Sequence, residues 1–334
     1  MRKEIPIIVI GASAGGSVVL QELIQQFTGN VNAAIFVVIH LSKKAIGEMV
    51  VNRIQKFSSL TCTIPRHRER IQSNHIYFAP ADRHMLIKED QILLGNGPLE
   101  NRYRPSIDAL FRSAAASHGN KTIGVVLSGM LEDGTAGMLA IKSVQGKCIV
   151  QDPEEAEYSG MPSSIVDTLQ PDFILPIAEM GSVIESLVRK VGKSKTKNVP
   201  VRLMKEAAIA ENVYIGIDQV SRLGSHSLFS CPDCGGGLWE MKEGNFTNYR
   251  CHVGHAFSET GLLSAMEAST EAALWTALRI LEERKNLLNK LGEKEVKNGK
   301  RQLTISFKKR ARELEVHISA LRDLLFKTQF DLTS

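Results

Sequence analysis

Residues 5–16 read IPIIVIGASAGG, a short apolar run followed at once by a turn rich in glycine. An apolar run of this length is typical of a buried strand, and the small residues after it allow a sharp turn into a helix. Ser13 lies in that turn, and such a junction can hold a serine oxygen exposed at the edge of a sheet. The backbone amides that open the helix, beginning with Ala14, are candidate donors to an oxyanion.

The same turn is also typical of dinucleotide-binding folds, where it cradles a pyrophosphate. That interpretation requires an acidic residue at the end of the second strand, which would bind a ribose. The second predicted strand covers residues 34–39 and ends at His40. A histidine is a poor ribose ligand, but it is the base that an activated serine needs. The spacing therefore favours a serine hydrolase over a dinucleotide-binding oxidoreductase.

Strand-like and helix-like patterns alternate along the first 190 residues. This alternation predicts an α/β fold with a doubly wound, mostly parallel sheet and helices on both faces. The short apolar runs at 76–79, 85–88 and 91–94 predict an antiparallel meander on that sheet. Active sites of open α/β sheets lie at the carboxyl ends of the strands. Ser13, His40 and the loop 128–137 all fall at such ends.

Asp133, in that loop, is the candidate acid that orients His40. The alternative is a helix cap, because an aspartate accepts hydrogen bonds from the amides of a first helical turn. The chain order serine, histidine, aspartate differs from the common α/β-hydrolase order, in which the acid precedes the histidine. Triads are recognised by geometry and not by chain order, so the order does not exclude one.

Composition and charge limit the other function classes. The chain has 334 residues, is 43% hydrophobic and carries a net charge of +5. It contains no run of the roughly 20 apolar residues that a membrane span needs, and its N-terminus does not resemble a signal peptide, so we expect a cytoplasmic protein without membrane insertion. The basic residues concentrate in segment 284–312. The only aromatic residue of that segment is Phe307, so we do not expect nucleic acid as a partner.

Three of the five cysteines form a second chemical pattern. Cys231, Cys234, Cys251 and His255 follow the spacing C-x2-C-x16-C-x3-H, which is typical of a tetrahedral structural Zn²⁺ site. His252 is the alternative fourth ligand. Four protein ligands leave no open position on the metal, so the predicted role is structural. Cys62 and Cys148 lie in apolar runs and are predicted to be core residues.

Apolar residues recur at coiled-coil spacing near the C-terminus. One stripe contains Leu274, Leu278, Leu281 and Leu288, and the other contains Phe307, Ala311, Leu314, Ile318, Leu321 and Leu325. These stripes predict an antiparallel α-helical hairpin over roughly 262–291 and 303–328. The whole chain therefore divides into a catalytic domain at 1–190, a connecting segment at 191–225, a zinc-ribbon-like module at 226–260 and a helical hairpin at 261–330.

Five separated motifs resemble those of CheB-type protein-glutamate methylesterases. They are residues 11–16 (GASAGG), 79–85 (APADRHM), 101–108 (NRYRPSID), 127–137 (LSGMLEDGTAG) and 160–162 (GMP). The resemblance implies hydrolysis of γ-glutamyl methyl esters on chemoreceptor helices, often with deamidation of receptor glutamines. We expect this reaction to need no cofactor. The family's catalytic residues fall on Ser13, His40 and Asp133, and an oxyanion donor falls on the backbone amide of Met130.

The sequence departs from better-known members of this family. Those members begin with a receiver domain, and this chain starts at the esterase strand, so we expect no control by phosphorylation in cis. Residues 38–42 resemble members that are fused or paired with methyltransferases. A methyltransferase and a separate receiver protein are therefore candidate partners. Arg102 and Arg104 are candidates to grip an acidic receptor surface, and the alternative is a structural role.

A non-enzymatic signalling scaffold on the same fold is the competing hypothesis. In that case the zinc module and the helices would be the functional parts. The presence of all three candidate triad residues argues against it, because a scaffold has no use for them.

Overall fold

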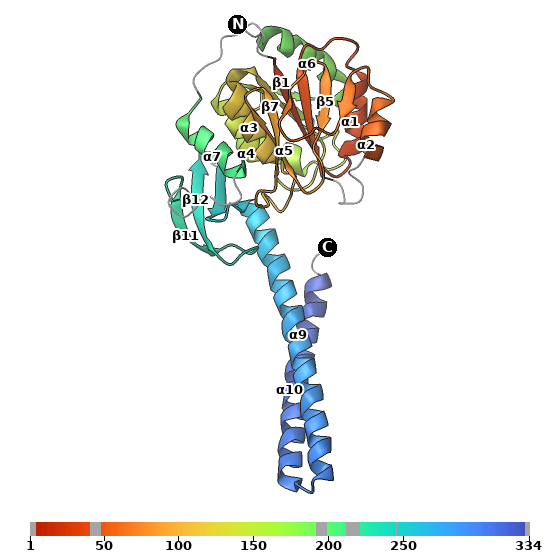
Figure 1. The fold of residues 1–334 in the computed structure, drawn as a ribbon, viewed down its shortest axis with the longest axis vertical. Helices are drawn as coiled ribbons and strands as arrows, with labels where there is room; N and C mark the ends of the chain where they lie inside the picture. The colour runs from red at the N-terminus through yellow and green to blue at the C-terminus, as the bar shows by residue number, and fades with distance from the viewer. Residues whose placement is uncertain (1–4, 41–47, 192–198, 212–220, 245, 331–334) are drawn as a thin grey trace. The chain divides into compact units, whose positions relative to one another are not determined.

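A computed structural model describes residues 5–40, 48–191, 199–211, 221–244 and 246–330 (Figure 1). The chain forms two compact units, Met1–Leu262 and Leu263–Ser334. The first unit holds a large α/β layer structure and a smaller antiparallel sheet. The second unit is helical.

The central sheet has seven strands, and every pairing in it is parallel. In spatial order the strands are β10 (Phe173–Leu175), β9 (Lys147–Gln151), β8 (Thr122–Val126), β1 (Ile7–Ala12), β2 (Ala34–Ile39), β5 (His75–Phe78) and β3 (Thr61–Thr63). Strands β1 and β2 are buried along their whole length, which explains their near-continuous apolar sequences. The predicted α/β class and mostly parallel sheet are confirmed.

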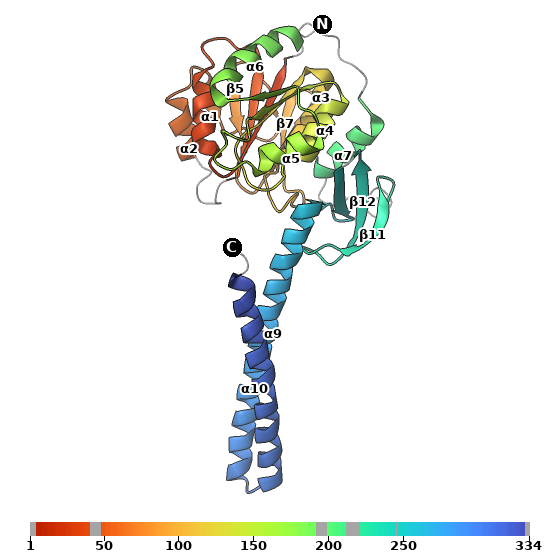
Figure 2. The same cartoon turned by 180° about the vertical axis from the view of Figure 1, so that it is seen from behind.

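Helices cover both faces of this sheet (Figures 1 and 2). Helices α1 (Gly16–Gln25), α2 (Glu48–Gln55) and α6 (Ile177–Val191) supply buried residues to one core cluster. Helices α3 (Ile107–His118), α4 (Thr135–Ser143) and α5 (Gly160–Thr168) supply them to the other. A short 3-10 turn, η1 (Gly119–Lys121), joins α3 to β8. The sheet is therefore doubly wound, as the sequence predicted.

The predicted antiparallel meander on this sheet is wrong. Strand β5 pairs in parallel with β2 and β3, inside the central sheet. Strands β6 (His84–Lys88) and β7 (Gln91–Gly95) are antiparallel, and they form a separate small sheet with β4 (Glu69–Arg70). The chain leaves the central sheet after β5 through Asp82, whose φ of 58° breaks the extended backbone. Met85, Ile87 and Ile92 then join the core cluster that contains α3.

A four-stranded antiparallel sheet follows helix α7 (Val201–Glu211). Its strands, in spatial order, are β11 (Ser225–Ser230), β12 (Gly237–Glu243), β13 (Phe246–Cys251) and β14 (Ala256–Ser258). We call this sheet with its connecting turns the β-module. Trp239 and Met241 of β12 pack with Leu223 and with Ile209 of α7 in a small apolar cluster.

Two long helices end the chain, α9 (Glu259–Lys297) and α10 (Arg301–Phe330). Residues from both predicted stripes, among them Leu278, Leu288, Leu314 and Ile318, are buried in one cluster, so the predicted hairpin is confirmed. The helices are longer than predicted because Gly292 lies inside α9, and only Gly299, with a φ of 72°, marks the turn. None of the described helices is both long and apolar enough to span a membrane.

Candidate active site

The candidate nucleophile lies where the strand order of the central sheet reverses. Strand β1 lies between β2 and β8, so the loops that follow β1 and β8 leave the sheet in opposite directions. Ser13 comes directly after β1, and its amide donates a 3.0 Å hydrogen bond to the carbonyl of Ser128, two residues beyond the end of β8. Gly15, with a φ of 70°, turns the chain into α1. Ser13 is only 7% exposed.

Small residues keep the space around Ser13 open. A Cβ added to Gly129 would overlap the sulfur of Met161 and would lie 2.8 Å from the Cβ of Ser13. The Gly129 loop is tied to the start of α5, because Gly129 donates to the carbonyl of Tyr158 and Met161 donates to the carbonyl of Gly129. Met130 and Tyr158 are exposed beside this site. Within the described part of the chain, no hydrogen bond occupies the amide of Ala14 or of Met130, so both remain candidate oxyanion donors.

His40 lies at the end of β2, next to the end of β1. Its backbone amide donates a 3.0 Å hydrogen bond to the carbonyl of Ala12, one residue before Ser13. Its Nε2 is 3.1 Å from Oδ2 of Asp133, although the ring is not aligned for a hydrogen bond. Such contacts often tighten only when a substrate is bound. The ring of Tyr103 stacks on the imidazole with centroids 3.6 Å apart and planes within 6°, which fixes the plane of the imidazole.

Asp133 does not cap the helix that follows it, since the N-cap position of α4 is Gly134. Its carboxylate instead accepts hydrogen bonds from the amides of Ile107 (2.7 Å) and Asp108 (3.2 Å), at the start of α3. Burial raises the pKa of Asp133, but His40 and the hydrogen bonds from Asn101 and Ile107 outweigh burial and hold this pKa below its usual value. The side chain is therefore a buried carboxylate that faces His40, and it also accepts hydrogen bonds from amides at the start of α3.

A second buried carboxyl group, Asp108, lies beside Asp133. It accepts hydrogen bonds from the amides of Gly134 (3.0 Å) and Gly137 (2.6 Å). Burial and the negative charge of Asp133 raise the pKa of Asp108 well above its usual value. The side-chain nitrogen of Asn101 donates to both carboxyl groups, to Asp108 at 2.7 Å and to Asp133 at 3.0 Å. The two acids therefore differ in pKa, with the lower pKa on the one that faces His40.

Sequence reasoning assigned no role to Asn101 and Tyr103, although both lie in one of the motifs. Their contacts with Asp133 and His40 join segments that are far apart in the chain, and no local sequence pattern predicts such contacts. Arg104 binds Asp82 at 2.7 Å and donates a 2.9 Å hydrogen bond to the carbonyl of Gly97. These contacts support the structural interpretation of Arg104.

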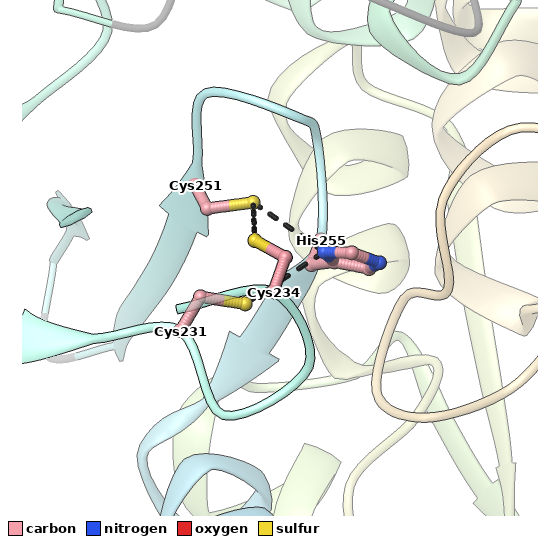
Figure 3. Close-up of side chains that lie close together, drawn as sticks. All are labelled: Cys231, Cys234, Cys251 and His255. Carbon is pink, nitrogen blue, oxygen red and sulfur yellow. Dashed lines mark hydrogen bonds between the residues drawn. The ribbon is translucent and has the colours of Figure 1, made fainter. Parts of the chain in front are cut away.

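The β-module brings Cys231, Cys234, Cys251 and His255 together (Figure 3). Their sulfur and nitrogen atoms all lie within 4.8 Å of one another, and His252 does not belong to this cluster. Cys231 and Cys234 come from the turn after β11, and Cys251 and His255 flank the turn between β13 and β14. The cysteines are free thiols, so the group is a candidate metal site and not a disulfide.

Comparison with known proteins gives a consistent result. A family model described as "CheB methylesterase" matches residues 8–184, which is more than half of the chain. A Methanosarcina mazei protein named protein-glutamate methylesterase/protein-glutamine glutaminase 2 is 34% identical over 191 residues, or 55% of this chain and 52% of that protein. A Leptospira interrogans protein named putative protein-glutamate methylesterase/protein-glutamine glutaminase is 32% identical over 177 residues, or 53% of this chain and 91% of that protein.

The crystal structure of a Thermotoga maritima CheB methylesterase catalytic domain is also similar. Its TM-score is 0.53 at 30% identity, and the match covers 55% of this chain and 99% of that domain. The chain spans about half the length of the first curated relatives that it matches. The family model's match ends before the β-module and the two long helices begin.

Proposed function

The chain belongs to the CheB methylesterase family, and we propose that it hydrolyses γ-glutamyl methyl esters on chemoreceptor helices with Ser13, His40 and Asp133. One observation carries this proposal. Ser13 and His40 follow two adjacent parallel strands, and a buried carboxylate of Asp133 lies 3.1 Å from the imidazole. The exposed apolar side chains of Met130 and Tyr158 beside Ser13 suit a substrate that is itself a protein surface.

The proposed mechanism starts with transfer of the Ser13 proton to His40 while the serine oxygen attacks the ester carbonyl. Because Asp133 lies against Nε2, Nδ1 is the imidazole nitrogen left to take this proton. The amides of Ala14 and Met130 stabilise the negative oxygen of the tetrahedral intermediate. Methanol leaves with the proton from His40, and a water activated by the same histidine then releases the glutamate from the acyl-enzyme.

Deamidation of receptor glutamines is a second proposed activity of the same site. The relatives' names pair methylesterase with glutaminase. The chemistry supports this pairing, because a glutamine differs from the ester only in its leaving group, and ammonia replaces methanol. No further residue is required for that step.

We also propose that the β-module binds one structural Zn²⁺ through Cys231, Cys234, Cys251 and His255. Zn–S bonds of about 2.3 Å in a tetrahedron set adjacent ligand atoms about 3.8 Å apart. Cys234 and Cys251 are separated by 3.8 Å, and Nδ1 of His255 lies 3.7 Å from Cys231 and 3.5 Å from Cys251. These separations fit a shared metal ion, and they far exceed the roughly 2.05 Å of a disulfide.

The proposal extends to the organisation and partners of the chain. Residues 1–190 supply the catalytic domain, 191–225 the connection, 226–260 the zinc module and 261–330 the helical hairpin. A methyltransferase or a separate receiver protein is the proposed partner for regulation. The cytoplasm is the proposed location.

Two measurements test the activity. Purified protein should release methanol from a methylated chemoreceptor, and a fluorophosphonate probe should label Ser13; the Ser13→Ala variant should do neither. Labelling without methanol release would leave a serine hydrolase with another substrate. Absence of both would favour the non-enzymatic scaffold.

A further inference from the structure

A tight turn at Glu100–Tyr103 lies between the candidate triad and the β-module. Glu100 and Tyr103 exchange backbone hydrogen bonds of 3.2 and 2.9 Å. The two central residues, Asn101 and Arg102, have φ values of 50° and 68°. This is the geometry of a two-residue turn with both central residues in the left-handed region, which asparagine tolerates better than most residues.

One side of the turn contacts both partners of Ser13. The side-chain nitrogen of Asn101 donates to Oδ1 of Asp133 at 3.0 Å. The ring of Tyr103 stacks on the imidazole of His40. The separation and orientation of histidine and acid therefore depend on how this one turn is held.

The other side of the turn is hydrogen-bonded to β14. The amide of Asn101 donates to the carbonyl of Ala256 at 2.7 Å, and the amide of Ser258 donates to the side-chain oxygen of Asn101 at 3.1 Å. The amide of Ala256 donates to the carbonyl of Leu99 at 3.3 Å. The Asn101 side chain thus donates to Asp133 and accepts from the β-module.

A buried group of one carboxylate and two arginines holds the same turn. Glu100 is 2% exposed and binds Arg112 of α3 at 2.5 Å and Arg250 of β13 at 3.1 Å. Burial raises the pKa of Glu100, but the two arginines outweigh burial and hold this pKa far below its usual value. Arg250 also donates to the carbonyl of Gly254, in the turn that carries Cys251 and His255. A buried carboxylate between two arginines of different elements holds those elements together, because removing one partner leaves a buried charge uncompensated.

We propose that the Glu100–Tyr103 turn is a positioning device through which the β-module orients His40 and Asp133, with Asn101 as the positioning residue. The inference rests on the proposed triad and goes beyond it, since it makes the β-module part of the catalytic apparatus. Neither Asn101 nor Arg250 touches the reacting atoms. Both act through the histidine and the acid.

The test compares rates of fluorophosphonate labelling of Ser13, together with kcat and KM for methanol release. Asn101→Gly removes the side chain and keeps a residue that accepts a positive φ. Arg250→Met removes the link from β13. Lys242→Met is the matched control, since Lys242 is an exposed cation of the same sheet that pairs only with Glu240 among the described residues. We expect labelling and kcat to fall about 10–100-fold in the first two variants, with KM nearly unchanged, because small misplacements of catalytic groups cost rate.

The double variant Asn101→Gly/Arg250→Met should be no slower than the slower single variant, because both substitutions release the same turn. Losses that multiply would overturn the proposal, as would wild-type labelling rates in either single variant. If Arg250→Met fails to fold, Asn101→Gly alone decides, because its substitution leaves the Glu100 ion group intact.

Amide hydrogen exchange gives a readout independent of activity. Removing metal from the full chain with a chelator should speed exchange at Asn101, whose amide bonds to Ala256, and should slow labelling of Ser13. Strand β1 should keep its protection. Unchanged exchange at Asn101 in metal-free protein would show that the β-module does not hold the turn. Ser13 labelling could slow in these variants as expected while no methylated receptor yields methanol. That result would refute the proposed substrate and would still support the positioning role of the turn.

Discussion

Replacing Asp133 with asparagine tests the candidate site through two separate quantities, rate and stability. The carboxylate accepts four hydrogen bonds, from Asn101, Ser106 and the amides of Ile107 and Asp108. Asparagine offers one oxygen in place of two. In either orientation its NH₂ group faces a backbone N–H, of Ile107 or of Asp108, and neither N–H can accept a hydrogen bond.

The structural cost of this substitution can be estimated from the lost contacts. One charge-assisted hydrogen bond is worth about 1.5–3 kcal/mol, and a buried donor left without a partner costs about 1–3 kcal/mol. Relief of repulsion with Asp108 offsets part of this sum. We therefore expect Asp133→Asn to lower the free energy of unfolding by about 2–4 kcal/mol. We also expect kcat to fall about 10⁴-fold, because the correct imidazole tautomer is no longer held.

Stability should be measured by hydrogen exchange of the slowest amides in β1, because Trp239 and Trp275 both lie outside the central sheet and report other regions. Asp172→Asn is the matched control. Asp172 also has a lowered pKa, but it pairs with half-exposed Lys142 and Lys147, and such pairs contribute about 1 kcal/mol or less. An Asp133→Asn protein with kcat within tenfold of wild type would refute the role of Asp133. Unchanged β1 exchange would refute the hydrogen-bond estimate.

Three further predictions follow from other parts of the structure. Ser13→Ala should lower kcat about 10⁶-fold, and adding His40→Ala should cost nothing more, since the two act as a unit; additive losses in methanol release would contradict this. Purified protein should contain about one zinc per chain by elemental analysis, and Cys234→Ser should lose the metal while His252→Ala keeps it. Metal loss from both variants would show that His252 is a ligand, contrary to the proposal. The native pKa of Glu100 lies below that of the unfolded chain, so its contribution to stability is complete above about pH 4.5 and is lost as the pH falls. Glu100→Gln should therefore make the acid-induced decline of the melting temperature shallower, and an equally steep decline would contradict the ion group.

The sequence predicts the middle of the central sheet well because β1, β2 and β8 are buried along their whole length and read as continuous apolar runs. The apolar spacing was also enough to predict helices α9 and α10. Only the predicted ends of these helices differ from the structure, since Gly292 is tolerated inside α9. Strand β5 was misassigned because a short apolar run does not reveal which strand it pairs with. Pairing partners depend on tertiary packing.

The same distinction applies to the candidate site. Ser13, His40 and Asp133 are candidates because each follows a predicted strand, and the cysteines are candidates because their spacing is local. The link from Asn101 to Ser258 spans 157 residues and uses a backbone amide, which leaves no mark in the sequence. Glu100 and Arg250 are 150 residues apart and look like ordinary surface charges until the fold buries them.

The pairing of β14 with the turn also bears on solubility. A free strand edge offers unpaired N–H and C=O groups to any other chain, and proteins avoid leaving such edges open. Here the amide and carbonyl of Ala256 and the amide of Ser258 are all occupied by residues 99–101. A substitution that releases these residues would therefore uncover a ready template for intermolecular β-pairing, and self-association of the protein would accompany its loss of catalysis.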